Sequence, residues 1–232
     1  MTAYFAMRGY FTFLIVLAAC LLIVSLFQFN INSKYSNTGR AIWVERYHQT
    51  EMNVKEAIVE AAREGAREGL AAYISCLLSS AITSKKMPVP DINCIKIYVN
   101  YFAVEKIASI NGAAIDNMAI NLDIDPKYYP PPDISLCPPP KCECTSCSSS
   151  SPGQNKNLNF LLDGDFNQTI TTINDKNKWD ALKNGQEDVN DTAKTALSQS
   201  ILTIQNDAIT VRINSGVGNV SFKMPQAEVK IG

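Results

Sequence analysis

Cysteine is the residue in this sequence with the clearest capacity for chemistry. Cys20 lies in an apolar run, and the other six cysteines are Cys76, Cys94, Cys137, Cys142, Cys144 and Cys147. An even number outside that run favours disulfides, with the pairing left open. Cys76 and Cys94 could close the turn at Pro88 and Pro90. The alternatives are free thiols or a metal site, although C-x4-C-x-C-x2-C is not the paired spacing of structural zinc.

Catalytic chemistry has few candidates. His48 is the one histidine, and its polar neighbours indicate a solvated helical residue. No G-x-S-x-G, H-E-x-x-H or phosphate loop occurs. Residues 163–167 resemble the start of a calcium loop, but the glycine and glutamate that such a loop needs are replaced by Gln168 and Asn174. We therefore expect no enzyme, no cofactor and no metal.

Three asparagines begin Asn-x-Ser/Thr sequons, which are acceptors for N-glycosylation in an exported chain. They are Asn167, Asn190 and Asn219. Together with the cysteines they favour an extracellular location for the bulk of the chain. The charges of the chain nearly balance, with 21 Lys and Arg against 22 Asp and Glu. A neutral chain has no strong electrostatic attraction to nucleic acid, so no nucleic-acid partner is expected.

The elements that position these residues begin with residues 9–33, which carry no charge. About 20 apolar residues match the thickness of a bilayer. Residues 10–29 therefore predict a transmembrane helix, after a cytoplasmic leader at 1–9, in a single-pass protein of the cell membrane with the lipid bilayer as a partner. A cleaved signal peptide is the alternative, but its apolar run is shorter and ends at small residues. The flanking positive charges do not decide the orientation.

The polar segment 30–39 predicts a hinge, and residues 40–85 predict a long helix. Within this helix a stripe of small residues recurs every fourth position, at Ala57, Ala61, Gly65 and Gly69. Two glycines inside a helix cost about 1 kcal/mol each relative to alanine. A close approach of another element would offset that cost. The stripe could pack on the protein's own sheet or on another subunit.

Residues 86–232 predict an α+β domain with a small antiparallel sheet and one further helix. Alternating apolar residues predict strands at 94–104, 118–124, 209–213, 220–224 and 229–231, and helical spacing predicts a helix at 186–205. Residues 126–153 hold many prolines, four cysteines and several serines. This composition predicts an exposed loop.

The order of leader, apolar helix, long helix and antiparallel sheet resembles that of type IV pilin-like proteins of bacteria and archaea. The local match is Arg8-Gly9 followed by Tyr10-Phe11-Thr12-Phe13-Leu14-Ile15. The resemblance implies cleavage between Gly9 and Tyr10. The family usually has glutamate at the fifth mature position, where this chain has Leu14, which indicates a minor or non-assembling member.

These patterns predict a non-enzymatic, pilin-like cell-surface protein, acting in filament or envelope assembly or in surface contact. Self-association or contact with envelope proteins is expected. The alternatives are a subunit of a membrane complex, or a solute-binding or enzymatic domain whose site forms only in three dimensions.

Overall fold

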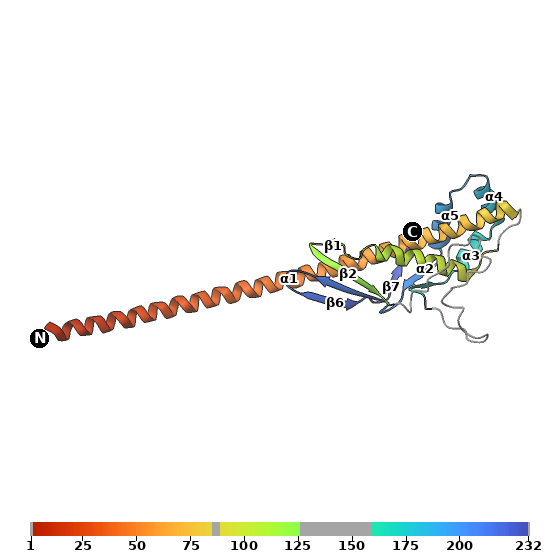
Figure 1. Ribbon diagram of the computed structural model, residues 1–232. Helices are drawn as coiled ribbons and strands as arrows, with labels where there is room; N and C mark the ends of the chain where they lie inside the picture. Colours follow the sequence, from red (N-terminus) through yellow and green to blue (C-terminus); the bar gives the residue numbers. More distant parts are fainter. Residues whose placement is uncertain (1, 85–88, 126–158, 232) are drawn as a thin grey trace, which may run out of the picture. The chain divides into compact units, whose positions relative to one another are not determined.

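The computed structural model describes the backbone of residues 2–84, 89–125 and 159–231. Within these ranges, the side chains of residues 2–20, 27, 29–38 and 84 are not described. Two compact units divide the chain at Glu51 and Met52. The helices are α1 (Thr2–Ser84), α2 (Ile92–Ala108), α3 (Asn167–Ile173), α4 (Lys176–Lys183) and α5 (Val189–Ser198). The strands are β1 (Ala114–Ile115), β2 (Met118–Ile124), β3 (Leu162–Gly164), β4 (Leu202–Ile204), β5 (Ile209–Asn214), β6 (Asn219–Lys223) and β7 (Ala227–Val229) (Figure 1).

The α+β class with a long helix and antiparallel sheets agrees with the structure, but the predicted transmembrane helix requires correction. Among the residues whose side chains are described, no helix is long and apolar enough to cross a membrane. Within 10–29, those side chains are Leu21–Leu26 and Gln28.

Residues 30–39, expected to form a hinge, are helical and lie inside α1. The segment is polar but contains no proline, so every residue in it has a backbone N–H for helical hydrogen bonding. The turn-forming residues favour other conformations only weakly. Composition alone therefore gave too strong a signal for a break.

The second unit contains an antiparallel sheet in the order β1-β2-β5-β6. Alternate residues point to opposite faces: Ile120 on β2 and Val211 on β5 are fully buried, whereas Asn121 and Arg212 are exposed. In the register of the sheet, Ile120 lies opposite Ile213 on the buried face. The strands predicted at 118–124, 209–213 and 220–224 correspond to β2, β5 and β6.

A smaller antiparallel sheet has the order β3-β4-β7. The last strand was predicted at 229–231, but β7 spans Ala227–Val229, so the two share only Val229. Leu202 of β4 lies opposite Val229 of β7, and both side chains are buried. The predicted helix at 186–205 is shorter in the structure, because α5 ends at Ser198 and β4 follows it. Strands β1, β3 and β4 and helices α3 and α4 were not predicted from the sequence.

The strand predicted at 94–104 is wrong, because these residues belong to helix α2. Asp91 caps the helix: its carboxylate accepts hydrogen bonds from the N–H groups of Asn93 and Cys94 at 2.7 and 3.3 Å. Nine residues of α2 are buried, including four in succession from Ile97 to Asn100. A helix covered on several sides loses the 3.6-residue apolar period. The remaining alternation of apolar and polar residues then resembled the pattern of a strand.

Candidate functional site

Helices α1 and α2 come closest at two glycines, within the second unit. A Cβ atom placed on Gly65 would lie 2.5 Å from the Cα of Ala103 and 2.5 Å from the carbonyl oxygen of Phe102. One placed on Gly69 would lie 2.5 Å from the carbonyl oxygen of Tyr98. The backbones touch here because glycine has no side chain. The element that the stripe meets at Gly65 and Gly69 is therefore the chain's own α2, rather than its own sheet.

The other two members of the stripe, Ala57 and Ala61, are half-buried. The core of this part of α1 is formed by neighbouring positions that are fully buried, among them Ile58, Ala62 and Ala66. The four-residue spacing correctly indicated close packing at Gly65 and Gly69. It did not identify the apolar positions that fill the core.

Ion pairs flank the glycine contact. The Nζ of Lys106, in the last turn of α2, lies 2.8 Å from the Oε1 of Glu68 and 3.5 Å from the Oε1 of Glu64. The hydrogen bond to Glu68 is the largest cause of a raised pKa for Lys106. Each glutamate directly precedes one of the contact glycines. Partly exposed pairs add little stability, so their main effect is to match the register of α2 to α1.

A different part of α1, in the first unit, exposes aliphatic side chains. Leu21, Leu22, Ile23, Val24 and Leu26 are between 52% and 67% exposed. At 3.6 residues per turn, these positions point in every direction around the helix axis. A helix that is apolar all round is normally buried, and contiguous apolar surface marks an interaction site. We call residues 21–26 the aliphatic segment.

The cysteine prediction requires correction. Of the six cysteines in the expected framework, Cys137, Cys142, Cys144 and Cys147 lie outside the described residues, as does the predicted loop at 126–153. Cys76 on α1 and Cys94 on α2 are both buried and are disulfide-bonded. The full set of three disulfides that the sequence predicts is not found at bonding distance among the described residues.

The candidates for catalysis and metal binding lie apart. His48 is exposed on α1 in the first unit. Asp163 lies in β3. Asp165 lies between β3 and α3, where its carboxylate accepts the N–H of Asn167 at 2.9 Å. Asp163 also lies 3.7 Å from the Nζ of Lys96. Within the described part of the chain, no group of three or more His, Cys, Asp or Glu residues could hold a metal ion.

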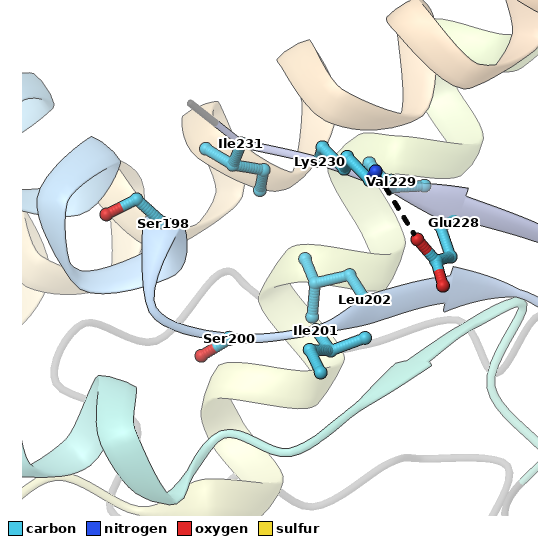
Figure 2. A pocket seen from close by; sticks show the side chains of 8 residues that line it. All are labelled: Ser198, Ser200, Ile201, Leu202, Glu228, Val229, Lys230 and Ile231. Carbon is cyan, nitrogen blue, oxygen red and sulfur yellow. Dashed lines mark ion pairs between the residues drawn. The ribbon is translucent and has the colours of Figure 1, made fainter.

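An open pocket of about 440 Å³ lies at the ends of β4 and β7 (Figure 2). Ser200 and Ile201 line one side of it, and Glu228 and Lys230 line the other. The two charged groups pair with each other at 3.8 Å. The hydroxyl of Ser200 is bound to the Oγ1 of Thr169 at 2.6 Å. The residues that line the pocket include no imidazole or thiol.

A buried polar residue that sequence reasoning missed is Asn100 of α2. Its Oδ1 accepts the N–H of Leu162 at 2.7 Å, and its Nδ2 donates to the carbonyl of Leu162 at 2.8 Å and to that of Lys96 at 3.0 Å. The amide thus pairs with β3 as a neighbouring strand would. A lone asparagine in an apolar run was the available signal. Its function is structural, since it joins α2 to the smaller sheet.

The structure describes the three sequons in full, but only the backbone of the pilin-like junction. Gly9, Tyr10 and Leu14 belong to the helical backbone of α1, and their side chains lie outside the described ones. Cleavage between Gly9 and Tyr10 stays a prediction. Asn167, Asn190 and Asn219 are all exposed.

Comparison of the chain with protein-family models, curated proteins and solved structures finds no match.

Proposed function

We propose that this chain is a non-enzymatic, pilin-like assembly protein. Copies associate through the N-terminal part of α1, and the α+β domain is presented for surface contact. The observation that carries the proposal is the aliphatic segment, whose side chains are unusually exposed for apolar residues. In a filament, neighbouring copies of the same helix would cover these side chains.

The energetics favour several neighbours rather than one. Full burial of a Leu, Ile or Val side chain contributes about 1.5–3 kcal/mol. Five such side chains, each roughly half to two-thirds exposed, offer on the order of 5 kcal/mol. Bringing two molecules together costs at least about 4 kcal/mol. A single pair of helices is therefore marginal, whereas a bundle buries each helix on all sides.

Two features of the chain support the pilin-like form of this proposal. The sequence around Gly9 and Tyr10 resembles the family's cleavage junction. In the second unit, the long helix α1 is followed by helix α2 and then by the strands of an antiparallel sheet, so the order that the resemblance implies is kept with one helix added (Figure 1). A fold likeness is weak evidence for function, so the assembly experiment is the decisive test.

The test is charge substitution in the aliphatic segment of the full-length chain. Leu22→Lys and Val24→Lys should abolish assembly, because each buries an unpaired charge among helices. Val217→Lys is the matched control: its side chain is 78% exposed but lies in a turn of the other unit. Sedimentation velocity and negative-stain microscopy measure assembly, and urea unfolding checks that the domain remains folded.

The expected result is assembly by the unchanged chain and by Val217→Lys, with loss in both helix variants. Assembly by Leu22→Lys and Val24→Lys at the level of the unchanged chain would contradict the proposal. So would a chain that remains monomeric at every concentration tested.

A further inference from the structure

The three sequons differ in how accessible their Ser or Thr hydroxyl group is. The Ser or Thr two residues after the asparagine is part of the recognition sequence, so a glycosylating enzyme must reach this hydroxyl as well as the asparagine amide. All three asparagines are exposed. The accessibility of the hydroxyl therefore decides which sequon the folded chain can offer.

In the first sequon, Asn167 begins α3 and the hydroxyl belongs to Thr169. This side chain is fully buried. Its Oγ1 lies 2.6 Å from the Oγ of Ser200 and donates to the carbonyl of Ala196 at 3.4 Å. An enzyme would have to break the packing of α3 on α5 to reach it.

In the second sequon, Asn190 lies in the first turn of α5 and the hydroxyl belongs to Thr192. This side chain is 2% exposed, and its Oγ1 donates to the Oε2 of Glu187 at 3.2 Å. The same carboxylate binds the Nζ of Lys178 at 2.8 and 3.0 Å through its two oxygens. The hydroxyl is thus buried and already bonded.

The third sequon, Asn219-Val220-Ser221, lies in strand β6. Asn219 and Ser221 are both exposed, whereas Val220 between them is half-buried. Residues two apart in a strand point to the same face, so the amide and the hydroxyl are presented together. Strand β6 is an edge strand of its sheet. In the chain it follows a turn in which the N–H of Ser215 donates to the carbonyl of Gly218.

We propose that Asn219 is the N-glycosylation acceptor of the folded chain and that Asn167 and Asn190 are not. The donor is an oligosaccharide linked through pyrophosphate to a lipid. The Nδ2 of Asn219 forms a bond to the sugar C1 as the bond between C1 and the pyrophosphate oxygen breaks. The amide loses one proton, and the lipid pyrophosphate leaves with the electron pair.

The position of Asn219 gives such a glycan a physical consequence. An open edge strand can pair with a strand of another molecule, and bulky or charged groups at the edge prevent this. A glycan on β6 would cover the open end of the four-stranded sheet. The sugar would thereby limit contacts between sheets and leave other surfaces of the chain free.

The test is glycosylation of the purified, folded full-length chain by an oligosaccharyltransferase that accepts any Asn-x-Ser/Thr sequon, supplied with its lipid-linked donor. Intact-mass and peptide mass spectrometry locate the product. The expected result is a mass increase of one glycan, at Asn219. It should be lost in Asn219→Gln and Ser221→Ala, and kept in Ser221→Thr, Asn167→Gln and Asn190→Gln.

The chain unfolded in urea and transferred to a denaturant level that the enzyme tolerates provides the comparison. Glycan at Asn167 or Asn190 in this sample, but not in the folded one, would support the role of the buried hydroxyls. Glycan at either position in the folded chain, or no glycan at Asn219, would overturn the proposal.

Discussion

Alanine at Gly65 tests how closely α1 and α2 pack. In an exposed helix, replacing glycine by alanine stabilises by up to about 1 kcal/mol. At Gly65 the new methyl group would lie 2.5–2.7 Å from three backbone atoms of Phe102 and Ala103. Backbone atoms cannot rotate away as a side chain does, so α2 must move. Such overpacking costs about 1–3 kcal/mol, which exceeds the gain in helix propensity over most of this range.

The expected net loss for Gly65→Ala is up to about 2 kcal/mol in the free energy of unfolding. Gly69→Ala should lose less, because its second and third contacts are longer, at 2.9 and 3.0 Å. The double variant should cost less than the sum, since the first methyl already displaces α2. Urea unfolding followed by far-ultraviolet circular dichroism measures all three free energies.

Gly39→Ala is the matched control, because Gly39 lies in the same helix with nothing within 4 Å of an added Cβ. This change should leave the unfolding transition of the domain unaltered or raise helix content slightly. Gly65→Ala and Gly69→Ala variants as stable as the unchanged chain, or more stable, would refute the close packing of these helices.

Three further predictions concern the contacts of α2. Asn100→Leu should cost about 1–3 kcal/mol for each backbone group of Leu162 left without a partner. Asn93→Leu, at an exposed position on the same helix, should cost little. Urea unfolding compares the two variants. Asp91→Ala removes the helix cap and should cost about 1 kcal/mol, measured in the same way. Burial is the main cause that raises the pKa of Tyr73 above 10.0, so its stabilising contribution should be complete below pH 10 and be lost as the pH rises through the raised pKa. Unfolding between pH 9 and pH 11 checks this, and an equally steep loss in Tyr73→Phe would contradict it.

The sequence by itself determined the features that depend on local pattern. Strict alternation located β2 and β5, because one face of each strand is buried and the other exposed. The absence of proline and the helical spacing located the long helix up to Ser84. The spacing of Gly65 and Gly69 indicated a close approach, because glycine inside a helix is costly unless something packs there.

Tertiary structure decided the features that depend on what surrounds a segment. Residues 94–104 form a helix because they pack between other elements, and that burial removed the period by which a helix is recognised. The partner of the glycines is α2 rather than the sheet, which the helix sequence alone does not specify. Likewise, three sequons with the same pattern differ in whether the hydroxyl is buried. Burial is set by contacts between residues distant in the chain, such as Thr169 with Ser200, and no local pattern encodes them.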